Sequence, residues 1–156
     1  MFSRLRIVSG GQTGVDRAAL DAAQALGLAS GGWCPRGRRA EDGIIPARYR
    51  LAETPSARYA ERTAWNVRDS DGTLVVLRVR LAGGTRLAAR LARRRWRKPL
   101  FVVKLREELP RLRFRAWLRR YRIRTLHVAG PRESEEPGIG AEAEAALRRL
   151  LAPARR

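Results

Sequence analysis

LRIVSGGQTGVDRAALDAAQALG, residues 5–27, contains the most informative structural pattern of the sequence. It begins with an apolar run suited to a strand and passes through a glycine-rich loop. It then continues with Val15, Ala18, Ala19, Ala22, Ala23 and Leu26 at helical spacing. Gly27 directly follows, and a glycine there is typical of a helix C-terminus. The stretch therefore predicts a strand–loop–helix unit, the building block of α/β folds.

The rest of the chain repeats this alternation. Residues 73–79, TLVVLRV, give the strongest strand pattern and should be central, because a nearly continuous β-branched run is typical of a strand buried on both faces. Residues 33–55 are rich in proline and glycine, which indicates irregular structure. We expect other strands at 28–34, 100–104 and 125–129, and helices over 57–68, from 83, around 109–121 and from about 138.

The alternation predicts an α/β fold: a doubly wound, mostly parallel five-stranded sheet with helices on both faces. The 156 residues, 44% of them hydrophobic, suffice for a single domain spanning 1–156. The sequence shows neither a signal peptide nor an apolar run long enough for a membrane span, and Cys34 is its single cysteine. We therefore expect a cytoplasmic protein without disulfides or a multi-cysteine metal site.

Positive charge is concentrated in the middle of the chain. The formal net charge is +19, and residues 78–124 contribute 18 basic and two acidic side chains to it. Such a segment permits salt-sensitive, nonspecific attraction to nucleic acid. A solvated basic surface is the simpler interpretation, and arginine outnumbers lysine so strongly that nucleotide composition is an equally good explanation of the bias.

Three glycine-rich loops run from a predicted strand into a predicted helix: SGGQTG (9–14), AGGT (82–85) and GPRESEEPGIG (130–140). Parallel strands would bring all three to one edge of the sheet. Helix N-termini and free backbone amides at such an edge favour an anion, and glycine lets a phosphate approach the main chain. With strand order 2-1-3-4-5, the first two loops would flank the ligand crevice at the switch point.

None of the loops matches a standard nucleotide motif. SGGQTG is neither G-x-G-x-x-G nor a P-loop, since no lysine follows Gly14. A tight turn that requires glycine remains the alternative for each loop taken singly. Among the nearby side chains, Gln12 and Thr13 could donate to a ligand, Arg132 could pair with an oxyanion, and Asp16 could either bind or complement its helix dipole.

Other polar residues have structural interpretations of comparable weight. Asn66, Arg68 and Asp69 precede the third strand, where turn and capping roles compete with ligand contact. Cys34 lies among arginines that would favour its thiolate if it were exposed, but packing is the stronger expectation. His127 lies inside a strand without partner ligands, so we expect a hydrogen-bonded structural histidine rather than a catalyst or metal ligand.

Taken together, these motifs resemble the molybdenum cofactor carrier family. The resemblance rests on IVSGGQTGVDRAALDAA, GGWCPRGRRAEDGIIPARY, TAWNVRDSDGTLVV, GGT, KPLFVV and VAGPRESEEPGIG, which occur in this order over nearly the whole chain. That family belongs to a Rossmann-like superfamily shared with the LOG proteins, also called lysine decarboxylase-like. The resemblance implies a homo-oligomer, a dimer or tetramer, that binds molybdenum cofactor, a pterin with a phosphate.

The resulting hypothesis is a carrier for molybdenum cofactor or a nucleotide, with no catalytic residue assigned and no metal bound directly by side chains. The candidate cofactor-binding residues are Gly10, Gly11, Gln12, Thr13, Gly14, Asp16, Arg38, Asn66, Arg68, Asp69, Gly83, Gly84, Thr85, Arg132, Glu133, Ser134 and Gly138.

Two alternatives remain open at this point. LOG-type relatives cleave nucleoside monophosphates with a P-G-G-x-G-T-x-x-E motif, but the matching stretch here, LAGGTRLAAR, has Ala88 in place of the glutamate. Another acid could take its place in a nucleotide-processing hydrolase. The second alternative is nucleic-acid binding by the arginine-rich segment, with Trp96, Trp117 and Tyr121 as stacking residues, although their helical spacing favours packing against the sheet.

Overall fold

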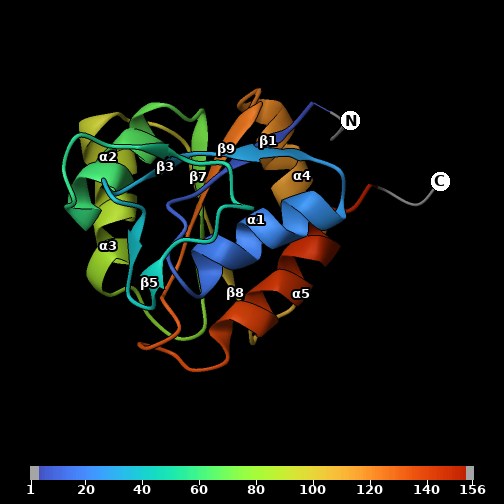
Figure 1. Cartoon of the computed structure of the whole chain (residues 1–156). Helices are drawn as coiled ribbons and strands as arrows, with labels where there is room; N and C mark the ends of the chain where they lie inside the picture. Colours follow the sequence, from blue (N-terminus) through green and yellow to red (C-terminus); the bar gives the residue numbers. More distant parts are fainter. Residues whose placement is uncertain (1–3, 154–156) are drawn as a thin grey trace.

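The computed structural model describes residues 4–153 and has an entirely parallel five-stranded main sheet (Figure 1). Its strands are β1 (Arg6–Val8), β2 (Ala29–Gly31), β7 (Gly72–Leu77), β8 (Leu100–Lys104) and β9 (Thr125–Ala129), in the order β2-β1-β9-β7-β8. The doubly wound α/β class predicted from the sequence is confirmed.

Helices cover both faces of this sheet. On one face α1 (Val15–Ala25), α4 (Arg111–Arg120) and α5 (Ile139–Leu151) share the largest apolar cluster with β1, β7 and β9, and α1 lies alongside α5 (Figure 1). On the other face α2 (Tyr59–Arg68) packs against α3 (Gly83–Arg90) and the π-helix η1 (Leu91–Arg95) that continues it. None of the helices described within residues 4–153 has the length and apolar character needed to cross a membrane.

The segment expected to be irregular contains two small strand pairs. β3 (Trp33–Cys34) pairs in parallel with β6 (Ala52–Glu53), and β4 (Arg39–Ala40) pairs antiparallel with β5 (Gly43–Ile44). Each strand has two residues, because the prolines and glycines between them interrupt longer pairing. Cys34 is fully buried in a cluster with Leu20, Ala40, Ile45 and Tyr49, and burial raises the pKa of its thiol, which favours the neutral thiol over the thiolate.

The strand order is not 2-1-3-4-5, the order for which the first two loops would flank the crevice. The first and third main strands, β1 and β7, are not neighbours, because β9 lies between them and pairs with both. Burial explains this placement. All but the first residue of β9 are buried, whereas β8 ends on exposed Lys104 and can tolerate an edge. β7 is interior and fully buried as predicted, but β9 is the middle strand.

The observed order has a simple relation to a common nucleotide-binding topology. In chain order the five strands lie 2-1-5-3-4. Moving the first strand of the Rossmann order 3-2-1-4-5 to the end of the chain gives this arrangement. The loop after β9 therefore takes the position at the switch point that the first loop of a Rossmann fold normally occupies.

The aromatic packing under α4 gives a direct test of the core. Phe114 is fully buried, with its ring centroid 5.4 Å from that of Phe101 and 5.9 Å from that of Trp117. We expect Phe114→Ala to lower the free energy of unfolding by about 3–5 kcal/mol, measured by urea denaturation. Leu112→Ala on the same helix, where the side chain is 82% exposed, should change it by less than about 0.5 kcal/mol. Equal effects of the two changes would contradict this packing.

Candidate functional site

A pocket of about 330 Å³ lies at the carboxyl edge of the sheet, between α2, the beginning of α3 and the loops after β1 and β9. All three glycine-rich loops contribute to it, which is the convergence predicted from the sequence. The candidate residues that line it are Gly10, Gln12, Asp16, Asn66, Gly83, Gly84, Thr85 and Arg132; further lining residues include Tyr59, Arg62, Thr63, Leu87, His127, Gly130 and Glu135.

A buried ion pair fixes one side of the pocket. The Arg62 guanidinium on α2 lies 3.2 Å from Asp16 Oδ2 and donates to the carbonyl oxygen of Gly10 at 2.9 Å. Burial raises the pKa of the Asp16 carboxyl, while Arg62 and the amides of Gln12 and Gly10 act to lower it. Because a Cβ at Gly10 would lie 2.1 Å from Arg62 Nη1, glycine is needed for this close approach.

The ion pair changes the role expected for the first loop. Its amides at Gly10 and Gln12 are directed at the protein's own carboxylate, Asp16, so they do not form an open phosphate cradle. Gly11 has φ +74° and packs toward Ile45 and Leu51, away from the pocket. The backbone of SGGQTG is therefore already neutralised by an internal anion.

Gln12 nevertheless presents a free donor. Its Oε1 accepts hydrogen bonds from the amides of Thr13 at 3.1 Å and Glu41 at 2.9 Å, which fixes which end of the carboxamide is the oxygen. The residue is only 6% exposed and lines the pocket. Within residues 4–153 no acceptor contacts its Nε2, so this NH₂ group is available to a ligand.

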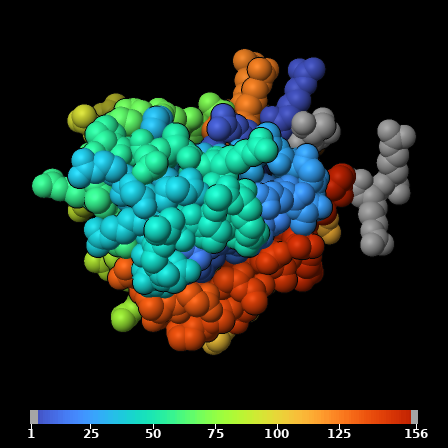
Figure 2. All heavy atoms as spheres, in the orientation of Figure 1, coloured from blue at the N-terminus to red at the C-terminus, as the bar shows by residue number. Residues whose placement is uncertain are grey.

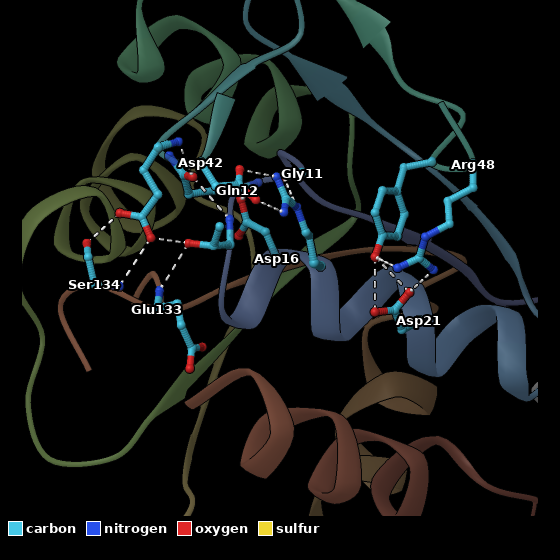
Figure 3. Close-up of polar contacts among 12 residues, drawn as sticks. Gly11, Gln12, Asp16, Asp21, Asp42, Arg48, Glu133 and Ser134 are labelled. Carbon is cyan, nitrogen blue, oxygen red and sulfur yellow. Dashed lines mark hydrogen bonds and ion pairs between the residues drawn. The ribbon is translucent and has the colours of Figure 1, made fainter. Parts of the chain in front are cut away.

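Carboxylates also occupy the amides of the third loop. Glu133 accepts from the amides of Gly138 at 2.5 Å and Gly140 at 2.9 Å, at the beginning of α5. Glu41 accepts from the Ser134 amide at 3.1 Å and from the hydroxyls of Thr13 and Ser134 (Figure 3). These contacts hold the loop after β9 against the loop after β1 and leave few of its amides for a ligand.

The second loop is different. Helix α3 begins at Gly83 without a side-chain cap and has no acidic residue in its first turn. The first amides of a helix lack intrahelical acceptors, and no carboxylate within residues 4–153 accepts from those of Gly83, Gly84 or Thr85. A Cβ at Gly84 would meet nothing within 4 Å. This helix N-terminus therefore has free amide donors of the kind that favour an anion.

Arg132 lies at the rim between two carboxylates. Its Nε is 3.2 Å from Glu135 Oε1 and 3.6 Å from Glu41 Oε2, and its side chain is 39% exposed. An anion entering the pocket can compete with Glu135 for this guanidinium, since both partners are partly exposed.

His127 lies on β9 with its Nδ1 3.4 Å from the Thr73 hydroxyl oxygen. Burial, assisted by the nearby charge of Arg62, lowers the pKa of His127 to about 3. The imidazole is thus neutral at pH 7 and lines the pocket as a polar but uncharged group, as expected for a structural strand histidine.

Arg38 does not lie in the pocket. Its guanidinium donates to the carbonyl oxygens of Ile45 at 3.1 Å, Pro46 at 2.9 Å and Tyr49 at 2.7 Å. These carbonyl groups lie outside the regular strands. Arg38 therefore stabilises the irregular segment 35–53 and does not face a ligand.

The remaining candidates divide between two places. Thr13, Gly14, Glu133 and Ser134 line a separate acidic hollow beside the pocket, with Gly138 at the nearby start of α5. Arg68 and Asp69 form a 2.7 Å ion pair at the far end of α2, where Asp69 also accepts from the Trp33 indole.

Asn66 lines the pocket, but its carboxamide is engaged by the backbone of Trp33. No group of three His, Cys, Asp or Glu side chains in the described chain could hold a metal ion.

The sequence of α2 also carries a signal that the glycine loops do not reveal. Tyr59, Arg62, Thr63 and Asn66 recur at i, i+3, i+4 and i+7, so the helix has a polar stripe. In the structure this stripe faces the pocket. A polar helix face directed at a sheet is unusual and would have identified Tyr59 and Arg62. Glu41 and Glu135 offer no such pattern, because their contacts come from loop geometry alone.

Comparison with known proteins supports the topology. Residues 7–151 match the model of the circularly permutated YpsA SLOG family, a description that agrees with the relocated strand β9. Among solved structures the chain is similar to a crystal structure of a "putative molybdenum carrier protein" from Syntrophus aciditrophicus, with 39% identity, a TM-score of 0.89 and 96% of each chain covered. The search of curated proteins gives no match.

The low pKa of His127 makes stability depend on pH. Because its pKa is about 3 in the folded protein, against an ordinary value of 6.5 in the unfolded chain, the unfolded chain takes up an additional proton between these values. Stability from this group is complete above pH 6.5 and is lost as the pH falls toward 3. We expect His127→Gln to flatten the decline of unfolding free energy in this window by about 1.4 kcal/mol per pH unit.

Urea denaturation at pH 4, 5 and 6 measures this difference. The raised pKa of Asp16 acts with the opposite sign, favouring the fold as the pH falls, but it is present in both proteins and largely cancels. Parallel stability curves for the two proteins would show that His127 is not buried as the neutral form.

Proposed function

The chain belongs to the circularly permutated YpsA SLOG family, and we propose that it binds the phosphate-bearing end of a molybdenum cofactor in the pocket at the carboxyl edge of its sheet. The name of the similar Syntrophus protein supports the carrier assignment. The sequence resemblance described above leads to the same class of ligand.

The observation that carries the proposal is the excess of free donors in the pocket. The α3 amides and Gln12 Nε2 have no acceptor within the described chain, whereas Asp16 is paired with Arg62 and Glu135 with Arg132. Unpaired donors beside neutralised acids suit a ligand rich in anionic oxygens, such as a phosphate or an oxometallate. The residues present therefore fit the cofactor.

Two sides of the pocket would contact different parts of the ligand. The α3 N-terminus would hold the phosphate, because its free amides and the positive end of its helix dipole both favour an anion in front of the helix. Tyr59, Ala60 and Leu87 supply apolar surface suited to a flat ring, and Gln12 would donate to an oxygen at the floor. A volume of about 330 Å³ is within the range of small-molecule sites.

Carrying a cofactor requires binding and protection rather than chemistry. The molybdenum cofactor would supply its own metal and pterin chemistry once delivered. This chain's residues would bind the phosphate at α3, orient the ring between α2 and α3, and limit water access. Arg132, held by Glu135 at 3.2 Å, would exchange that carboxylate for the ligand as it enters.

Gly84 offers a direct test of the phosphate position. A side chain there has open space, so Gly84→Asp should fold and place a negative charge at the α3 amides. We expect it to weaken binding of molybdenum cofactor, released from a molybdoenzyme, by at least about tenfold in titration calorimetry, through charge repulsion at the helix N-terminus.

Gly84→Asn is the matched control, since it has the same size without the charge. It should weaken binding by less than about threefold. Equal losses for Asp and Asn, or no loss for either, would place the phosphate elsewhere.

The identity of the ligand is tested separately. Mass spectrometry of small molecules released from the purified protein should find a pterin phosphate. A co-purified nucleotide, or release of adenine from AMP by the protein, would instead support the nucleotide-processing alternative; loss of that release in Glu135→Gln or Asp16→Asn would then identify its acid.

A further inference from the structure

Arginine side chains gather at the amino edge of the sheet, opposite the pocket. β-Strands of a parallel sheet all begin at this amino edge, and the helices that precede them end there. η1 ends just before β8, and α4 ends just before β9. The arginine-rich segment of the sequence is thereby divided into two clusters, 93–97 and 119–124, which the fold brings to the same edge.

A third contribution comes from the N-terminal segment. Arg6 begins β1, which pairs with β9 in the register Arg6↔Thr125, and its amide donates to the carbonyl oxygen of Arg124 at 2.8 Å. Figure 2 shows side chains of the N-terminal segment (blue) and of the segment near residue 125 (orange) projecting from this edge. Residues far apart in the sequence thus join one basic surface. We call Arg6 with the arginines of 93–97 and 119–124 the amino-edge surface.

Charge on the amino-edge surface is not compensated. Its arginines are all exposed, and none forms an ion pair with a carboxylate of residues 4–153. Two acids that precede β7 at this edge are already engaged: Asp69 pairs with Arg68 at 2.7 Å, and Asp71 accepts from the amides of Arg124 and Thr125. Like charges so gathered repel one another unless a polyanion covers them.

We infer that the amino-edge surface binds the phosphate backbone of nucleic acid without sequence preference. Clustered arginines supply the phosphate contacts that dominate nonspecific affinity. Tyr121, 47% exposed between the arginines, has the Arg120 guanidinium 5.7 Å from its ring centroid, so a base that stacks at this ring would also meet a cation. Trp117, in contrast, packs in the aromatic cluster of α4 and is not available.

An anionic membrane is another polyanion, but the amino-edge surface lacks the apolar face that membrane binding requires. Helices that bind membranes carry a large apolar face beside their basic residues. The most exposed aliphatic side chains of the described chain are Ile44, Val79 and Leu112. Val79 follows the carboxyl end of β7, Leu112 lies at the beginning of α4, and Ile44 belongs to β5, so none lies on the amino-edge surface.

The opposite placement of the two sites predicts that they act independently. The pocket lies at the carboxyl edge and its candidate donors come from α3 and the loop after β1. The nucleic acid should therefore bind with equal affinity in the presence of saturating AMP or molybdenum cofactor.

The test is fluorescence anisotropy with a labelled 20-nucleotide single-stranded DNA at several salt concentrations. The test variant combines Arg94→Gln, Arg95→Gln, Arg119→Gln and Arg120→Gln, all in helical segments where glutamine is well tolerated. The control combines Arg36→Gln, Arg50→Gln, Arg58→Gln and Arg149→Gln, which remove the same charge from exposed positions outside the surface. Circular dichroism confirms that both fold.

We expect binding at 50 mM salt that weakens at least tenfold in the test variant and less than about threefold in the control. The slope of log affinity against log salt should fall by about 2–3 in the test variant, since each phosphate contact contributes about 0.7. Equal losses in the two variants, or no binding by the wild type, would overturn the proposal. So would binding only to phosphatidylserine vesicles, with loss in the test variant, because that outcome assigns the surface to membranes.

Discussion

The insertion of β9 between β1 and β7 determines where the glycine-rich loops lie. It brings the loop after the last strand beside the loop after the first, and places both opposite the beginning of α3. Without this pairing the three glycine-rich loops would not share one pocket. The same insertion aligns Arg6 with Thr125, so it also assembles the basic surface at the other edge.

Within the pocket the deciding factor is which backbone amides remain free. Helix N-termini and glycine loops attract anions in general, but a protein's own carboxylates can satisfy them first. Here Asp16 takes amides of the first loop, and Glu133 and Glu41 take those of the third. The amides at the α3 N-terminus, in contrast, meet no carboxylate within the described chain. Three loops that look equivalent in sequence therefore have different roles: two fix the architecture and one remains open.

Most of the fold could be predicted from hydrophobic periodicity. The bounds expected for the fourth and fifth main strands, 100–104 and 125–129, match β8 and β9, because short apolar runs bounded by charged or glycine residues leave little freedom. The strand order could not be predicted, since it depends on which strand buries best in the middle. Pattern alone did not show that β9 would be more buried than β8.

The candidate site was predicted less completely, and the reasons are physical. Parallel strands bring the loops that follow them to one edge of the sheet. The position of Gly84, Thr85 and Arg132 at that edge could therefore be predicted. Arg38 was misplaced because its role depends on carbonyls of an irregular segment that no periodicity reveals. Arg62 was missed although its helix was predicted. Its importance comes from burial against Asp16, 46 residues away in the chain.

A crystal structure of the protein soaked with molybdenum cofactor would locate the phosphate. We expect phosphate density against the amides of Gly83, Gly84 and Thr85, with the Asp16–Arg62 pair intact behind it. Density on the Gly10–Gly14 backbone with Asp16 displaced, or in the acidic hollow beside Glu41, would contradict this expectation.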